Sequence, residues 1–382
     1  MLNRKAPIGT LASLFVVTLS ACQGTASEPS PDLAPAPDLS PRPIPKAVYT
    51  TSNEVAGNRV FAYTRAADGT LSALGAYATG GKGTGAGLGD QNALVFDAAR
   101  GLFFAVNAGD NSISMLALQA DGGLALRANV PSGGVRPVSI TSAGDVVYTV
   151  NAGDANTAGN IAGFRISGET LTAIPGATRP LSAAATGPAQ IQFTPSGGLL
   201  VVTEKMTNKI DTYAVTAGVA GAPMVQNSAG VTPFGFAFSA EGRLLVSEAA
   251  GAMANKGSTS SYAVAASGAL TPVSSAVASG QTAPCWVAVI GSTAYVTNAQ
   301  TNNITAYRVA ADGMLTLLSN GVSATTGMGP TDLDATDGND LLYVLSGRDH
   351  AFSIYGVNAD GTLTRKPDFT GLPDTAVGLV AR

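Results

Sequence analysis

Seven polar residues could carry chemistry in this 382-residue chain, because each ends an apolar run at an equivalent position of a repeated pattern. In chain order they are Ser52, Asn107, Asn151, Glu204, Glu248, Asn298 and Ser346. The three asparagine amides are candidates for ligand binding. Asn and Ser also simply end strands and begin turns, so a structural role is the alternative for these members.

The two carboxylates of this set, Glu204 and Glu248, are less well explained by turn chemistry. Carboxylates from neighbouring copies of a repeat could ligate a divalent cation or share one proton. We therefore predict that Glu204 and Glu248 are candidate catalytic residues and, if a cation binds, its ligands. The alternative is that both are ordinary surface carboxylates.

His350 is the only histidine and lies in the predicted loop SGRDHAFS. A zinc site built from several histidines is therefore excluded within one chain. His350 could act as a catalytic acid–base group oriented by Asp349, but no GxSxG motif supplies the serine of a hydrolase triad. An exposed loop histidine is the simpler interpretation.

Three more residues are candidates for ligand contact. Cys285 and the only tryptophan, Trp286, follow a proline that opens one copy of the repeat, and Arg136 directly precedes another such proline. A nucleophilic thiol needs a nearby base, and the sequence places none beside Cys285. A buried structural cysteine is the alternative.

The repeat that positions these residues is clearest between Pro284 and Leu315. A proline opens one strand, a Gly turn leads to a second strand that ends in a polar residue, and an alternating third strand runs into Asp-Gly, a strong hairpin signal. Copies recur about every 50 residues, a period that is typical of a β-propeller when each copy holds several strands. They begin near Gln91, Pro137, Pro188, Pro233, Pro284 and Pro330.

The first copy, Ala47–Ala78, lacks an innermost strand, and the last residues, Thr375–Arg382, read as a spare one. Joining the two ends would close the ring and leave no open sheet edge. The sequence therefore predicts an all-β, seven-bladed β-propeller over residues 47–382, closed by a C-terminal strand that joins the N-terminal blade. The composition agrees, since Gly (46) and Pro (21) are plentiful.

Composition also limits the partners. Only 12% of the residues are charged and the net charge is −4, so the chain lacks the basic stripe that nucleic-acid binding requires. The only two cysteines are Cys22 and Cys285, which leaves no disulfide framework if Cys22 is modified. We expect a monomer stabilised by sheet packing.

The N-terminal residues are expected to lie outside the fold. Residues 1–21 combine a basic start with an apolar run, and the following LSAC resembles a bacterial lipoprotein signal with Cys22 as the lipidated residue. Residues 22–46 are rich in proline and predict an extended tether. Gln23 favours the outer membrane, so we expect a protein of the bacterial cell envelope, bound to the membrane by its lipid. An ordinary secretory signal is the alternative.

The segment YVTNAQTNNITAYRVAADGMLT resembles the repeat of the seven-bladed lactonase family, which includes propeller-type 6-phosphogluconolactonases and 3-carboxymuconate cyclases. The resemblance covers residues 47–382 and implies a histidine, an arginine, a glutamate and a further arginine in the site. These positions correspond to Gly187–Gln190, Thr232–Phe234, Glu248 and Asn298–Ala299, where only the glutamate is present. Without a cationic clamp and an acid–base group, the implied site is degenerate.

The sequence thus favours a lactonase-like propeller lipoprotein that binds a small carbohydrate-like ligand or an envelope protein. We expect no cofactor, although a divalent cation is possible. The alternative is an enzyme, either a lactone-ring hydrolase or a muconate cyclase-like protein, with a site rebuilt around Glu248, Glu204 and His350.

Overall fold

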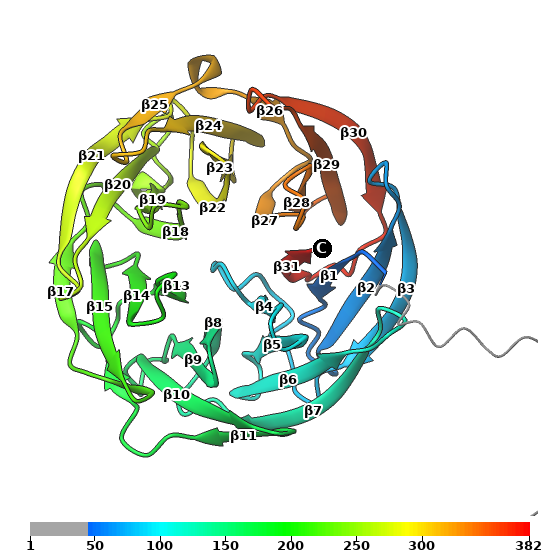
Figure 1. Cartoon of the computed structure of the whole chain (residues 1–382), viewed down its shortest axis with the longest axis vertical. Helices are drawn as coiled ribbons and strands as arrows, with labels where there is room; N and C mark the ends of the chain where they lie inside the picture. Colours follow the sequence, from blue (N-terminus) through cyan, green and yellow to red (C-terminus); the bar gives the residue numbers. More distant parts are fainter. Residues whose placement is uncertain (1–44) are drawn as a thin grey trace, which may run out of the picture. The chain divides into compact units, whose positions relative to one another are not determined.

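The computed structural model describes residues 45–382, which form seven antiparallel sheets around a central axis (Figure 1). This confirms the predicted all-β, seven-bladed β-propeller. The predicted signal peptide, Cys22 and nearly all of the tether lie outside the described residues. No helix of the described part is long and apolar enough to cross a membrane.

Each blade is a sheet that starts at the axis and ends at the rim. Blade one holds β31 (Val377–Ala381), β1 (Ala47–Thr51), β2 (Arg59–Arg65) and β3 (Leu71–Ala78). Blade two holds β4 (Leu94–Asp97), β5 (Leu102–Asn107), β6 (Ser112–Leu118) and β7 (Leu124–Pro131). Blade three holds β8 (Pro137–Ala143), β9 (Val146–Asn151), β10 (Asn160–Ser167), β11 (Thr170–Ala173) and β12 (Arg179–Pro180).

The other four blades repeat this order. Blade four holds β13 (Pro188–Phe193), β14 (Leu199–Glu204), β15 (Lys209–Thr216), β16 (Val219–Ala220) and β17 (Met224–Asn227). Blade five holds β18 (Pro233–Phe238), β19 (Leu244–Glu248), β20 (Ser258–Val264) and β21 (Leu270–Ala278), with the 3-10 turn η1 (Ala250–Ala252) after β19. Blade six holds β22 (Pro284–Ile290), β23 (Thr293–Asn298), β24 (Asn303–Val309), β25 (Leu315–Leu317) and β26 (Ala324–Thr325), with η2 (Ser319–Gly321) between the last two. Blade seven holds β27 (Pro330–Ala335), β28 (Leu341–Ser346), β29 (Ala351–Val357) and β30 (Leu363–Thr370).

The two ends of the propeller meet in blade one, as predicted. β31 pairs antiparallel with β1, with Tyr49 opposite Val380, and the hydroxyl of Thr50 donates to the Gly378 carbonyl at 2.7 Å. Arg65 donates from Nε to the carbonyl of Arg382 at 2.8 Å. The last strand therefore supplies the missing innermost strand and closes the ring.

The second strand of a blade is the most buried part of its sheet. Every residue of β9, β14, β23 and β28 is buried, because neighbouring blades pack on both faces of the sheet. These strands consequently read as continuous apolar runs that end in a polar residue. The outermost strands, such as β7 and β30, consist mostly of exposed and partly buried residues.

Adjacent blades are joined by one recurring hydrogen bond, in which a buried hydroxyl donates to the carbonyl of the glycine in the next blade's outer turn. Tyr49, Tyr148, Tyr295 and Tyr343 donate to Gly122, Gly218, Gly361 and Gly69 at 2.8–2.9 Å. Thr212 and Ser261 donate to Gly268 and Gly313 at 2.8 and 2.6 Å. Six of the seven junctions therefore share this bond.

The acceptor glycines have a left-handed backbone, with φ between 85° and 95°, which a residue with a side chain adopts only under strain. The junction between blades two and three differs. Phe104 occupies the place of the tyrosine there, and the outer-turn Gly168 has a φ of 58°. Because phenylalanine has no hydroxyl, this junction is closed by side-chain packing, including that of Phe104 and Val147.

We predict that Tyr295→Phe lowers the free energy of unfolding by about 1–2 kcal/mol, because the Gly361 carbonyl loses the donor that joins it to the neighbouring blade. The matched control is Tyr77→Phe, whose hydroxyl makes no hydrogen bond within residues 45–382 and whose removal should change stability by less than about 0.5 kcal/mol. Urea denaturation followed by circular dichroism measures both. Equal effects of the two substitutions would contradict a role for the inter-blade bond.

Candidate functional site

The seven polar strand-end residues are all completely buried, with 0% exposure. We call the face with the loops that lead into the innermost strands the top face, and the opposite face the bottom face. The strand ends lie under the loops of the top face. Glycines in four of these loops, Gly81, Gly134, Gly230 and Gly327, pack so closely that a Cβ atom would lie 2.0–2.8 Å from the covered side chain. The sequence located these positions correctly, but they do not form an exposed ring.

The three candidate asparagines are held inside their own blades. Asn107 donates to Ser112 and Ser114 at 3.1 and 2.8 Å, and Asn298 donates to Thr305 at 2.8 Å. Asn151 donates to the side chain of Asn160 at 2.7 Å. Each amide thus braces the second strand against the third strand, and a ligand-binding role for them stays a prediction.

Glu248 is braced in the same way. Ser258 and Ser260 of β20 donate to its two carboxylate oxygens, and the adjoining Gly230 leaves no space beside them. Burial raises the pKa of Glu248 above its ordinary range. The group therefore has neither an open face nor a free oxygen with which to meet a substrate in this structure.

Glu204 forms a buried carboxyl pair that the sequence did not reveal. Ser182 donates from its backbone N–H and its hydroxyl to Glu204, and Thr207 donates to the same carboxylate. Asp211, completely buried on β15, lies close to Glu204. Burial, and next the Glu204 carboxylate, raise the pKa of Asp211 to about 8. Both carboxyls belong to blade four, whereas Glu248 belongs to blade five.

Glu204 and Glu248 have separate sets of partners, and no hydrogen bond of the described residues links them. Within residues 45–382 no group of three or more His, Cys, Asp or Glu side chains is placed to hold a metal ion. A catalytic or metal-binding role for the two glutamates stays a prediction, to which this geometry adds no support.

His350 and Arg136 lie on the top face. The His350 side chain is 41% exposed, and its Nδ1 lies 3.7 Å from the carboxylate of the exposed Asp374. Arg136 is exposed and has a left-handed φ of 57°, and its backbone N–H donates to Asn111 at 2.7 Å. Neither residue contacts a second candidate catalytic group in the described structure.

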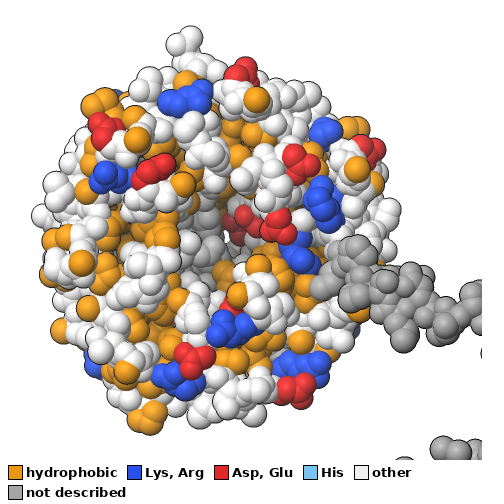
Figure 2. Space-filling model, viewed as in Figure 1, with side chains coloured by type: hydrophobic (Ala, Val, Ile, Leu, Met, Phe, Trp, Pro, Cys, Tyr) orange, Lys and Arg blue, Asp and Glu red, His pale blue; other side chains and the backbone are white. Residues whose placement is uncertain are grey.

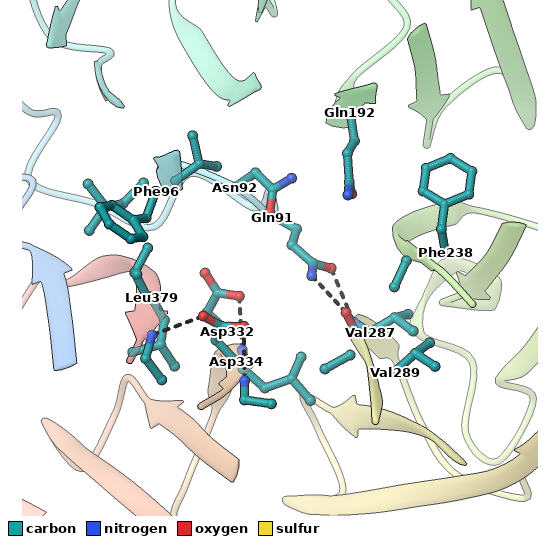
Figure 3. Close-up of a pocket in the computed structure, with 18 of the residues that line it drawn as sticks. Gln91, Asn92, Phe96, Gln192, Phe238, Val287, Val289, Asp332, Asp334 and Leu379 are labelled. Carbon is teal, nitrogen blue, oxygen red and sulfur yellow. Dashed lines mark hydrogen bonds between the residues drawn. The ribbon is translucent and has the colours of Figure 1, made fainter. Parts of the chain in front are cut away.

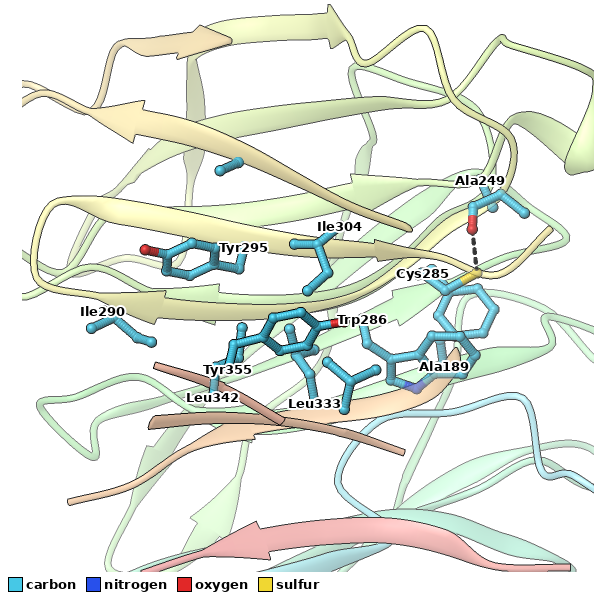
Figure 4. Packing of buried hydrophobic residues seen from close by; sticks show 14 residues of the cluster. Ala189, Ala249, Cys285, Trp286, Ile290, Tyr295, Ile304, Leu333, Leu342 and Tyr355 are labelled. Carbon is cyan, nitrogen blue, oxygen red and sulfur yellow. Dashed lines mark hydrogen bonds between the residues drawn. The ribbon is translucent and has the colours of Figure 1, made fainter. Parts of the chain in front are cut away.

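Cys285 and Trp286 belong to a buried cluster between blades five, six and seven (Figure 4). Each is 5% exposed, and the Cys285 thiol donates to the carbonyl of Ala283 at 3.3 Å. Burial raises the pKa of Cys285 to about 12, which keeps the thiol protonated and poorly nucleophilic at neutral pH. The structure thus favours the structural alternative for Cys285.

The top end of the central channel is closed by residues 88–92, which we call the roof segment. Figure 1 shows it projecting from β4 towards the axis. Gln91 makes a two-point contact across the channel: its Nε2 donates to the Val287 carbonyl at 2.8 Å, and its Oε1 accepts from the Val287 N–H at 3.1 Å. Its own N–H donates to the Ala189 carbonyl at 3.0 Å.

Further contacts fix the roof segment. Trp286 donates from its indole N–H to the Asp90 carbonyl, and the Lys205 ammonium donates to the Gly89 carbonyl. Gly235 lets the Gln91 side chain pass, since a Cβ atom there would lie 2.2 Å from Oε1. The roof segment is therefore bound to blades four, five and six and separates the top face from the channel below.

Below the roof segment the channel is a polar cavity of about 580 Å³, open at the bottom face. Figure 2 shows a hollow at the centre of the disc with acidic side chains at its edge. Asp332 and Asp334 of β27 line one wall, below Gln91, while Gln192 of β13 and Phe238 of β18 face them (Figure 3). Asp332 is 3% exposed. This cavity is a candidate ligand site, since polar side chains from several blades line it.

Burial controls the charge of the cavity. It raises the pKa of Asp334 to about 7 and that of Asp332 well above its ordinary range, to which the nearby Asp90 carboxyl contributes. Asp334 accepts from the Ala381 N–H at 2.9 Å, so the cavity wall is also tied to the strand that closes the ring. The sequence contained a local signal for this wall. The two aspartates of PTDLDA are two residues apart in a strand, so they lie on the same face of the sheet.

The comparisons with known proteins establish the fold alone. No protein-family model matches the sequence, and no curated protein matches it significantly. A proposed 6-phosphogluconolactonase from Bacteroides uniformis superposes with a TM-score of 0.68 at 18% identity, over 88% of this chain and 99% of that one. The periplasmic gluconolactonase of Pseudomonas aeruginosa gives 0.65 at 14% identity, over 88% and 98%. A proposed 6-phosphogluconolactonase from Bacteroides fragilis gives 0.65 at 17%, over 88% and 97%.

In the stretch where the family resemblance implies a histidine, Gln190 is completely buried and makes a two-point contact with the backbone of Phe236, at 2.9 and 2.6 Å. Gln190 thus ties blade four to blade five, as Gln91 ties the roof segment to blade six. The residues found in place of the implied catalytic groups are consequently part of the packing.

We predict that the protein loses stability as pH rises from about 4 to about 8, because buried Asp211 keeps its proton in the folded state while the unfolded chain releases it. A carboxyl whose pKa is higher in the folded state than in the unfolded state contributes stability at low pH, and this contribution is lost as the pH rises. Asp211→Asn, which removes the titrating carboxyl at nearly the same size, should reduce the decrease in unfolding free energy between pH 5 and pH 8 by about 2 kcal/mol or more. Asp374→Asn, a change at an exposed aspartate, should leave it unaltered. Urea titrations at the two pH values test this, and an unchanged slope in Asp211→Asn would contradict it.

Proposed function

We propose that this protein is a non-catalytic, ligand-binding β-propeller of the bacterial cell envelope, held at the membrane by a lipid on Cys22. The observation that carries the proposal is the state of the top face. The roof segment closes the channel there, and Glu248 is fully buried between two serines. A substrate that approached from this face would not reach Glu248, and the exposed His350 there lies next to Asp374 and not next to Glu248.

The chemistry of lactone opening supports the same conclusion. Water attack on a lactone carbonyl needs a base for the water and a positive group for the developing oxyanion. The stretches where the resemblance implies these groups hold Gln190, Phe234 and Ala299, and the first two are buried. The competing proposal is a lactone hydrolase with a rebuilt site. Its support is the fold shared with proposed lactonases. Within residues 45–382 no group of three or more His, Cys, Asp or Glu side chains adds to that support.

We predict that the full-length chain does not hydrolyse δ- or γ-lactones faster than buffer does. Proton release on ring opening, measured with a pH indicator against glucono-δ-lactone and a panel of simple lactones, tests this. Glu248→Gln should behave like the wild type in this assay and in its circular dichroism spectrum. Turnover by the wild type that disappears in a folded Glu248→Gln variant would establish the hydrolase instead.

We also predict that Cys22→Ala moves the protein from the membrane fraction to the soluble fraction of the envelope, because a lipid chain contributes about 0.8 kcal/mol of membrane affinity per buried CH₂ group. Cys285→Ala is the matched control, since these are the only two cysteines and Cys285 is buried in the propeller. It should stay with the membrane. Membrane retention of Cys22→Ala would contradict lipid anchoring.

A further inference from the structure

We propose that the cavity below the roof segment binds a small, neutral, polyhydroxylated ligand, a sugar or a polyol, which enters from the bottom face. This inference rests on the proposed binding function and specifies its ligand. The cavity, about 580 Å³, has the size of small-molecule sites, and its lining comes from several blades. A ligand there would be held from opposite sides by groups that the ring keeps at fixed positions.

The lining offers hydrogen bonds of both kinds. The carboxyls of Asp332 and Asp334 come from blade seven, and the amides of Gln192 and Asn92 come from blades four and two. The Gln192 oxygen accepts from Gln190, which leaves its NH₂ group without a partner among the described residues, and Gln192 is partly exposed to the cavity. A hydroxyl group both donates and accepts, so vicinal hydroxyls match paired carboxyl and amide groups.

Anions are disfavoured in this cavity, because its lining holds three aspartates, Asp332, Asp334 and Asp337, against one basic residue. Arg382 is the only basic residue in the lining, and its guanidinium carbon lies 4.6 Å from the centre of the Phe96 ring. The Nε and Nη1 atoms of Arg382 are buried, which leaves at most its Nη2 atom to contact a ligand. The Asp332 and Asp334 carboxyls would repel a carboxylate or phosphate to the extent that they are ionised.

Cations are disfavoured for the opposite reason. The charged and titratable groups around the cavity are Asp332, Asp334, Asp337, Asp90 above them, Lys205 beside Asp90, and Arg382 at the mouth. An ammonium ligand would require ionised carboxylates, and burial opposes ionisation of Asp332 and Asp334. A neutral ligand needs no such change, and the partly exposed Phe238 ring provides an apolar surface for the C–H face of a sugar.

The test compares three ligands that share most of their atoms and differ in charge: D-glucose, D-gluconate and D-glucosamine, with myo-inositol as a second neutral polyol. Isothermal titration of the full-length chain at pH 7 should show binding of at least one neutral ligand, about tenfold or more tighter than the charged pair. Gln192→Leu and Asp334→Asn should each weaken that binding about tenfold. Asp374→Asn, on the other face, should leave it unchanged.

Each variant is checked by circular dichroism and thermal unfolding, and Asp334→Asn keeps an oxygen for the Ala381 N–H, so folding should survive. Tighter binding of gluconate, or tighter binding of glucosamine with an affinity that increases from pH 6 to pH 8, would overturn the proposal. So would the absence of binding by both neutral ligands at millimolar concentration. These outcomes leave the lactone assay unaffected, so failure of the ligand class and failure of the non-catalytic function can be told apart.

Discussion

The hydrogen bond from a buried hydroxyl to the outer-turn glycine of the next blade is the interaction on which the propeller depends. It fixes the rim of each blade against the body of its neighbour, at six junctions of the ring. A left-handed glycine turns the carbonyl inwards, so the hairpin signal in the sequence also sets the distance between sheets. Closure by β31 then requires that the rotations between successive blades add up to one full turn. An error at one junction would leave β31 without its partner β1.

A closed ring leaves a channel, and this chain treats its two ends differently. At the top the roof segment crosses the opening, and Gln91 holds the backbone of a blade 196 positions away in sequence. At the bottom the channel stays open and polar. The roof segment therefore leaves the bottom face as the side from which a ligand can enter the channel.

The sequence was sufficient for the features that depend on local pattern. The strand order, the closure by residues 375–382 and the strand-end positions of Glu204 and Glu248 follow from alternation and turn residues, and the structure agrees with them. The complete burial of those strand ends could not be read from the sequence, because it depends on the loop glycines that pack over them. The roof segment and the pair of Glu204 with Asp211 were missed, since both arise from contacts that no local pattern specifies.

Buried carboxyls without a cationic partner lower the stability of the fold. Each must either ionise where water cannot solvate it or keep a proton that the unfolded chain would release. Asp211 is compensated in part, since the hydroxyl of Tyr213 donates to it at 3.4 Å. Asp332 and Asp334 have no such partner of their own and face a cavity. A hydrophobic pair would pack β27 against the channel at lower cost. The channel wall is polar at the open bottom end, whereas Gln91 of the roof segment fills the top end. This contrast is the strongest physical reason to look for the ligand at the bottom face.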